Sequence, residues 1–171
     1  DALEKIQIET KVVFDADYSD GYPSRKLINW FQNENKFKKL INEFKPDFIF
    51  VDRQRHFGLS AIKSKIPLIV HLRGDFWKEM QMAKETLYKS FPKKIALKKW
   101  YKIADECFKN SKIILPICGH LQKRTSEYYP GQNIEVLYQG INPKNWYYEK
   151  GMNLKHPCIG LVQSANIWEK T

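Results

Sequence analysis

The sequence lacks long apolar segments and has few cysteines. It has no run of about 18 or more uncharged apolar residues, which excludes an ordinary membrane-spanning helix. Residues 1–5 carry neither the basic start nor the apolar stretch of a signal peptide, so we expect a cytoplasmic protein. Cys107, Cys118 and Cys158 lie too far apart in sequence to form the close cysteine pairs of metal and redox sites. We therefore expect free thiols and no metal site.

Acidic residues are scarce relative to basic ones. The chain has 19 Asp and Glu against 29 Lys and Arg, which gives a formal net charge of +10 at pH 7. A charge of this sign favours anionic partners such as nucleic acid, phosphorylated substrates or an acidic membrane surface, but does not select one of them. The length of 171 residues and the 43% hydrophobic content are those of a globular domain with a real core.

Short apolar segments alternate with helical patterns along the chain. The predicted strands are Lys11 to Phe14, Phe48 to Val51, Leu68 to Leu72, Ile113 to Ile117 and Ile134 to Leu137. Such segments suit strands that are covered by helices on both faces, because neither face then meets water. We expect helices over about 24–45, around 59–62 and over 121–129, and one more that includes residues 100–108 and ends near Asn110. The predicted fold is α/β, with a Rossmann-like, doubly wound parallel sheet.

The two ends of the sequence predict a chain that continues beyond them. Residues 1–6 resemble the tail of a helix that feeds the first strand, and a crossover of this kind normally begins with an earlier strand. A new apolar segment begins at Cys158, after a polar stretch. We expect one domain over residues 1–150, with its first strand missing. Residues 151–171 are predicted to be a linker and the first strand of a second, truncated domain.

Polar residues follow the predicted strands, where open parallel sheets bind their ligands. The candidates are Asp52, Arg53, Gln54, Arg55 and His56 after the second strand, His71, Arg73, Gly74 and Asp75 at the third, Cys118, Gly119 and His120 after the fourth, and Gln139 and Gly140 after the fifth. Guanidinium groups bind oxygens bidentately, imidazole donates or accepts a proton, and glycine admits a close ligand. Taken singly, each has a structural explanation, such as a local ion pair of Asp52 with Arg53. Taken together, they predict a cleft for a phosphate or polyhydroxyl ligand.

Several segments resemble the N-terminal domain of GT-B glycosyltransferases of family 4, also called glycosyl transferase group 1. The segments are Lys45-Pro46-Asp47 before a strand, Ile66-Pro67 leading a strand to Gly74, and residues 134–142 followed by Trp146. The last is similar to the family's Val-x-Asn-Gly-Val-Asp-x-x-x-Phe pattern. The resemblance covers nearly the whole chain, with departures at Arg73-Gly74 for His-Gly, Cys118-Gly119 for Ser-Glu and Gln139-Gly140 for Asn-Gly.

The resemblance implies a retaining transferase that moves a sugar from a nucleotide-sugar donor to an acceptor such as a lipid-linked glycan or polysaccharide. It implies no separate cofactor, and no protein partner beyond a C-terminal donor-binding domain, without which we expect this chain to be inactive. The implied catalytic residues are His71, Arg73, Asp75 and His120. The implied acceptor- or sugar-binding residues are Arg53, Arg55, His56, Gly74, Cys118, Gly119, Gln139 and Gly140, and Lys170 is implied at the donor phosphate.

The middle of the chain is its most basic part. Residues 78–112 contain ten Lys against four acidic residues, interleaved with aromatic side chains such as Trp100 and Tyr101. This pattern predicts either a peripheral contact with the anionic inner face of a membrane or an ordinary solvated helix pair. Nucleic acid is a weaker candidate because no recognised binding motif is present. Two other functions stay open, namely a sugar-nucleotide epimerase of GT-B fold and a non-catalytic basic module that binds polyanions.

Overall fold

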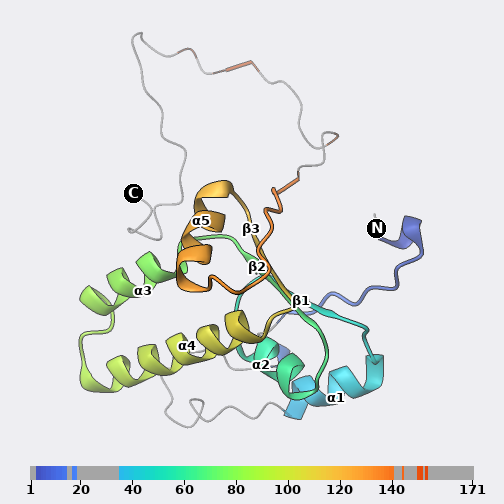
Figure 1. Ribbon diagram of the computed structural model, residues 1–171, viewed down its shortest axis with the longest axis horizontal. Helices are drawn as coiled ribbons and strands as arrows, with labels where there is room; N and C mark the ends of the chain where they lie inside the picture. Colours follow the sequence, from blue (N-terminus) through green and yellow to red (C-terminus); the bar gives the residue numbers. More distant parts are fainter. Residues whose placement is uncertain are drawn as a thin grey trace. The chain divides into compact units, whose positions relative to one another are not determined.

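The computed structural model describes residues 3–14, 17–18, 35–140, 144, 150–151 and 153. The chain divides into two compact units, Asp1–Leu137 and Tyr138–Thr171. The first unit is an α/β structure and holds every helix and strand named below (Figure 1). The described residues of the second unit include 138–140, which are exposed and lie outside helices and strands.

A three-stranded parallel sheet is the centre of the first unit. Its strands are β1 (Ile49–Val51), β2 (Leu68–Leu72) and β3 (Ile113–Pro116), in the order β1-β2-β3. Val51 lies opposite Val70, and His71 lies opposite Leu115. Because all three strands run in the same direction, their carboxyl ends reach one edge of the sheet. These three predicted strands are confirmed to within a residue at each end.

The predicted strand at 134–137 runs beside β3 without becoming a continuous strand. Ile134 forms a single parallel bridge with Ile114. The amide of Glu135 donates to the carbonyl of Ile114 at 3.1 Å, and the amide of Leu137 donates to the carbonyl of Pro116 at 2.9 Å. The segment therefore occupies the position of a fourth parallel strand.

The predicted strand Lys11–Phe14 is wrong, because residues 11–14 form no strand. They follow a single turn of 3-10 helix, η1 (Glu4–Ile6). Val12 and Phe14 are 82% and 72% exposed, so neither side chain packs into the core. An apolar segment forms a strand only where a neighbouring strand supplies hydrogen bonds and packing. Within the described part of the chain, residues 11–14 pair with no strand. The segment beginning at Cys158 and most of the first predicted helix lie outside the described residues.

Within the described residues, the first unit has five α-helices besides the sheet. They are α1 (Asn35–Phe44), α2 (His56–Lys63), α3 (Phe76–Glu85), α4 (Phe91–Asn110) and α5 (Gly119–Tyr128). Four of them match predicted helices, and α1 ends before Pro46 as expected. Sequence analysis did not single out α3, which begins where the side chain of Asp75 accepts a hydrogen bond from the amide of Lys78 at 3.0 Å. None of the described helices is both long and apolar enough to cross a membrane.

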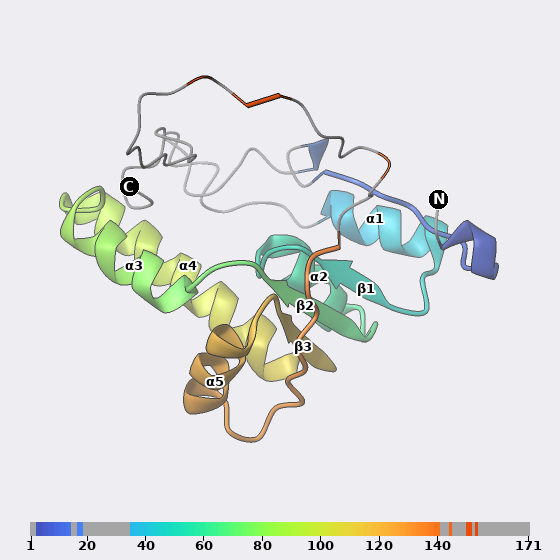
Figure 2. The same cartoon turned by 90° about the horizontal axis from the view of Figure 1, so that it is seen from above.

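The core is concentrated on one face of the sheet. Val70 and Ile114 are fully buried there, and α2 and α4 both contact β2 (Figure 2). The side chains of the opposite face are less covered, and Phe50 is 47% exposed. Side chains alternate between faces along a strand, so Asp52 is predicted to share the face of Phe50. The α/β class with a parallel sheet is confirmed, and the doubly wound arrangement stays a prediction.

Candidate functional site

Three polar residues meet where β1 and β2 end at the carboxyl edge of the sheet. The pairing of Val51 with Val70 places the next residues, Asp52 and His71, side by side. Asp52 Oδ1 lies 2.8 Å from His71 Nδ1, and Arg73 Nη1 donates to Asp52 Oδ2 at 2.8 Å. We call Asp52, His71 and Arg73 the edge cluster.

Asp52 is the centre of the edge cluster and keeps its charge over a wide pH range. Its partial burial acts to raise the pKa of the carboxyl group, but the hydrogen bonds and positive charge of Arg73 and the contact with His71 outweigh this effect and lower the pKa. The side chains of Asp52 and Arg73 are each 51% exposed. About half of the carboxylate side chain and half of the guanidinium side chain are thus exposed at the same edge.

His71 is held in one orientation. An ionised carboxylate only accepts hydrogen bonds, so Nδ1 carries a proton and donates to Asp52. The side chain is only 10% exposed, and the ring lies 5.5 Å from that of Phe50. Nε2 is buried and has no hydrogen-bond partner among the residues that the structure describes. A ligand hydroxyl reaches it only if a neighbouring side chain moves.

Asp75, a predicted catalytic residue, has structural partners. Besides capping α3, its carboxylate lies 3.1 Å from Arg124 Nε of α5. The Arg124 guanidinium lies over the ring of Tyr128, which stacks on Trp77 of α3 at 4.3 Å between ring centroids. These contacts hold α3 and α5 together. Arg124 was missed by sequence reasoning, because a single arginine within a polar helix gives no signal of its partner.

Arg55 and His56, two predicted binding residues, lie at the start of α2. The Arg55 guanidinium lies 5.5 Å from the Trp100 ring of α4, and its carbonyl accepts from Cys107 Sγ at 3.6 Å. The His56 carbonyl accepts a hydrogen bond from Ser60 Oγ at 3.1 Å. The hollow beside them is about 10 Å³, the space of one water molecule at most. These contacts join α2 to α4, and the binding roles of Arg55 and His56 stay predictions.

The other predicted residues are distributed along the chain after β1, β2 and β3. Arg53 is exposed, and Gly74 lets the Glu79 carboxylate approach, since an added Cβ would lie 2.7 Å from Glu79 Oε1. Cys118 is half-buried at the start of α5, and Gly119 and His120 are exposed. Gln139 and Gly140 belong to the second unit, and Lys170 lies outside the described residues. Their roles stay predictions.

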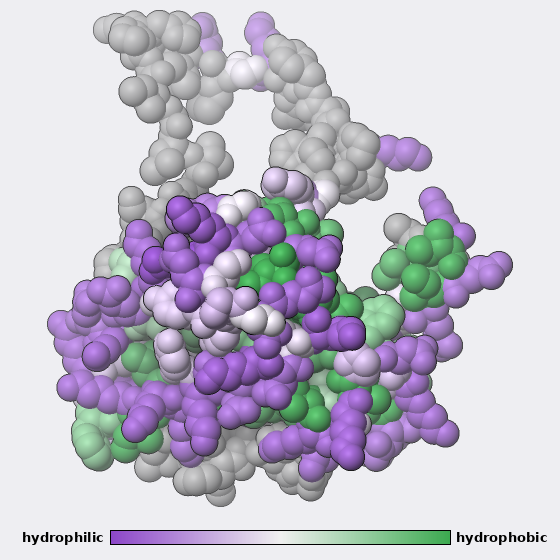
Figure 3. Space-filling view, viewed as in Figure 1, coloured by the Kyte–Doolittle hydropathy of each residue, from purple (hydrophilic) through white to green (hydrophobic). Residues whose placement is uncertain are grey.

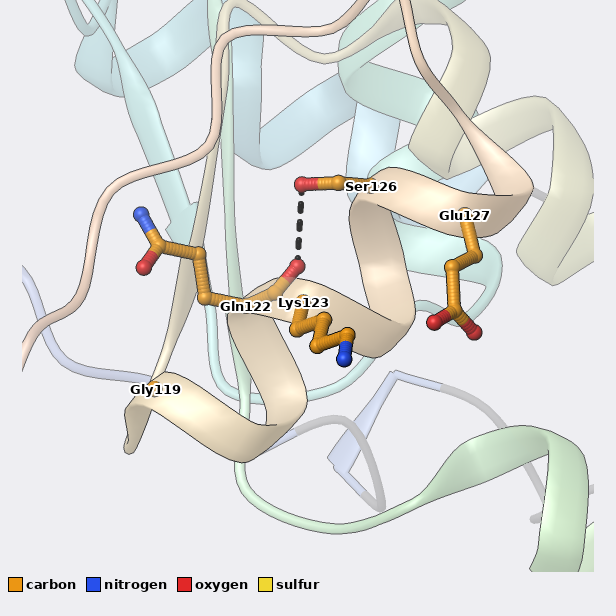
Figure 4. A pocket seen from close by; sticks show the side chains of 5 residues that line it. All are labelled: Gly119, Gln122, Lys123, Ser126 and Glu127. Atoms are coloured by element: carbon orange, nitrogen blue, oxygen red, sulfur yellow. Dashed lines mark hydrogen bonds between the residues drawn. The ribbon is translucent and has the colours of Figure 1, made fainter.

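A shallow open depression of about 440 Å³ runs along α5 (Figure 4). It is lined by Gly119, Gln122, Lys123, Ser126 and Glu127. All five residues belong to one helix, and Ser126 Oγ donates to the Gln122 carbonyl of the same helix at 3.0 Å. Groups from several elements do not converge there, so the edge cluster is the better candidate site.

Comparisons with known protein families, with curated proteins and with solved structures find no match for this chain. Within the described residues, no group of three or more His, Cys, Asp and Glu side chains is placed to hold a metal ion. The edge cluster can bind hydroxyl or phosphate oxygens through Arg73, and hydroxyl protons through Asp52.

Proposed function

We propose that this chain is the acceptor-side domain of a retaining glycosyltransferase of GT-B fold, with a doubly wound Rossmann-like sheet. The reaction moves a sugar from a nucleotide-sugar donor to an acceptor such as a lipid-linked glycan or polysaccharide. The observation that supports it is the edge cluster, in which Asp52, His71 and Arg73 converge at the edge where parallel sheets bind ligands. The resemblance to family 4 supplies the reaction class.

The edge cluster has the chemistry that an acceptor sugar needs. In the transfer, the bond from the anomeric carbon to the donor diphosphate breaks, a bond to an acceptor hydroxyl oxygen forms on the same face, and the proton of that hydroxyl passes to the departing diphosphate. Asp52 accepts the hydrogen bond of a sugar hydroxyl, and Arg73 donates to a second oxygen. His71 fixes the Asp52 carboxylate through the 2.8 Å contact. His120, on the first turn of α5, completes the proposed acceptor site.

Ligand titration followed by NMR tests the binding half of this proposal. We expect sugars, sugar phosphates or nucleotide sugars to shift the amide signals of residues 52–53 and 71–75. Asp52→Asn and Arg73→Ala should each weaken that binding by about tenfold, because each removes a hydrogen bond to a charged group. Lys112→Ala is the control, since this exposed lysine precedes β3 at the opposite edge. Unchanged binding in both edge variants contradicts the proposal.

Turnover of the proposed two-domain enzyme tests the catalytic half. Arg73→Ala and His120→Ala should lower kcat/KM by about tenfold or more, because both alter groups proposed to face the acceptor or the transferred sugar. Product analysis distinguishes a transferase, which forms a new glycosidic bond, from an epimerase, which returns an isomeric nucleotide sugar. If neither substitution changes kcat/KM, the assignment of these two residues is wrong.

A further inference from the structure

Helices α3 and α4 form a hairpin, and large apolar side chains are exposed in its turn and in the first turns of α4. Leu87, Phe91 and Ile95 are 51%, 77% and 39% exposed, respectively. In Figure 1 this hairpin extends away from the sheet, and the same region in Figure 3 shows hydrophobic surface bordered by hydrophilic side chains. We call these three residues the hairpin tip. Apolar side chains gathered in this way at a basic surface commonly mark a contact site.

The helical spacing of α4 separates the hairpin tip from the core. The buried side of α4 carries Ala96, Leu97, Ala104, Cys107 and Phe108. Phe91, Ile95, Lys98 and Lys102 follow one another at spacings of four, three and four residues, and all four are exposed. Residues at this spacing share one face of a helix. Apolar and basic side chains thus lie in a row on the outer face of α4.

Positive charge surrounds the hairpin tip. From residue 84 to residue 102 the chain has seven lysines and one acidic residue, Glu85. Lys94, Lys98 and Lys102 are exposed. The Lys93 ammonium group donates to the Leu87 carbonyl at 3.3 Å, which places a positive charge beside the tip. An anionic partner that also accepts apolar side chains fits this surface.

We propose that the hairpin tip binds an anionic lipid bilayer, with Phe91 and its apolar neighbours entering the interface and the lysines contacting the headgroups. A bilayer offers both components at once, since amphipathic surfaces bury their apolar side chains at the acyl boundary while lysines attract anionic lipids. Single-stranded nucleic acid is bound chiefly by aromatic rings that stack on bases. Leu87 and Ile95 are aliphatic and offer no ring for stacking. The proposal depends only on this surface and stands whether or not the chain is a glycosyltransferase.

Vesicle flotation with the full 171-residue chain tests the proposal. We expect flotation with vesicles of phosphatidylglycerol and phosphatidylcholine, and none with phosphatidylcholine alone. Phe91→Ser should weaken binding by about tenfold, because it removes apolar surface buried in the interface. The double substitution Lys94→Glu with Lys98→Glu should weaken it by about tenfold or more, since each lysine near an anionic surface contributes a several-fold gain in affinity.

Matched substitutions at other positions test whether the binding depends on this surface or only on the overall charge and hydrophobicity of the chain. Phe14→Ser removes a phenyl ring that is 72% exposed, and Lys36→Glu with Lys38→Glu makes the same charge change on exposed lysines of α1. Both should float like the unchanged chain, and circular dichroism should show that all variants are folded. Equal losses in the tip and control variants would overturn the proposal. So would equal binding to neutral vesicles, or salt-sensitive binding to an oligonucleotide without any flotation.

Discussion

Two pairs, each of one glycine and one cysteine, differ in how closely they are packed. Gly58 of α2 and Cys107 of α4 meet in the core, where a Cβ added to Gly58 would lie 2.7 Å from Cys107 Sγ. Cys118 and Gly119 adjoin in sequence after β3, where Cys118 is half-buried and a Cβ added to Gly119 would meet nothing within 4 Å. The first pair is closely packed, whereas the second has open space beside its glycine.

The contrast shows how identical residue types acquire different roles. Gly58 lets α2 approach α4, because only a residue without Cβ fits against the buried thiol. Gly119 has no such steric demand, because an added Cβ would meet nothing within 4 Å. Three measurements test this difference between the packed pair and the edge.

Thiol labelling should give the largest difference. Burial raises the pKa of the Cys107 thiol to about 12, and the side chain is 0% exposed. The thiolate is the reacting form, so at about pH 8 we expect Cys118 to react with iodoacetamide at least about a hundredfold faster than Cys107. Mass spectrometry of the resulting peptides measures both rates. Similar rates in the folded protein would mean that α4 opens readily and that the packed pair is not a stable part of the core.

Alanine substitution should separate the two glycines by stability. Gly58→Ala should lower the free energy of unfolding by about 1–3 kcal/mol, because overpacking outweighs the gain of about 1 kcal/mol in helix propensity. Gly119→Ala, where the added methyl group meets open space, should change it by less than about 0.5 kcal/mol. Urea unfolding followed by circular dichroism measures both.

Removing the thiol tests the cause of the Gly58 effect. If the clash with Cys107 Sγ is responsible, Cys107→Ala should recover about 1 kcal/mol in the Gly58→Ala background, seen as a coupling free energy in a double-mutant cycle. Additive losses would place the strain elsewhere, for example against Leu68, whose Cδ2 would lie 3.4 Å from the added Cβ.

The sequence predicts the sheet better than the site because the two depend on different information. The run Leu68–Leu72 is apolar except for His71, and a largely buried strand favours that composition, so local pattern is enough. Lys11–Phe14 has a similar pattern but pairs with no described strand. Residues 11–14 would need a neighbouring strand to pair with, and the local sequence pattern does not show whether one is present.

The site depends on strand register, which no single segment contains. The sequence places Asp52 and His71 after or within separate strands, and a local ion pair of Asp52 with Arg53 was the simpler interpretation. The observed pairing of Val51 with Val70 brings Asp52 to His71 and Arg73 instead. Asp75 was predicted as a catalytic residue, and helix α3 was not predicted. In the structure its side chain accepts a hydrogen bond from the amide of Lys78 in the first turn of α3.

Acid titration of stability should give the smallest effect and tests the electrostatics of the edge. The pKa of Asp52 is lowered from 3.8 in the folded state, so its contribution to stability is present above about pH 4 and is lost as pH falls through the folded pKa. Because the Asp52 carboxylate is 51% exposed, the contribution should be below about 1 kcal/mol. Asp52→Asn should therefore reduce the free energy of unfolding slightly at neutral pH and flatten its decline in acid.

Asp47→Asn is the matched control, since it neutralises an exposed carboxylate two residues before β1. If the edge cluster holds its charge as described, Asp52→Asn changes the slope of stability against pH below about pH 4 more than Asp47→Asn does, because the lowered pKa of Asp52 contributes to that slope. Equal slopes in both variants would show that Arg73 and His71 do not stabilise the Asp52 carboxylate in solution. The carboxylate would then be no more organised than Asp47, and the edge cluster would lose the preorganisation on which its proposed role in binding depends.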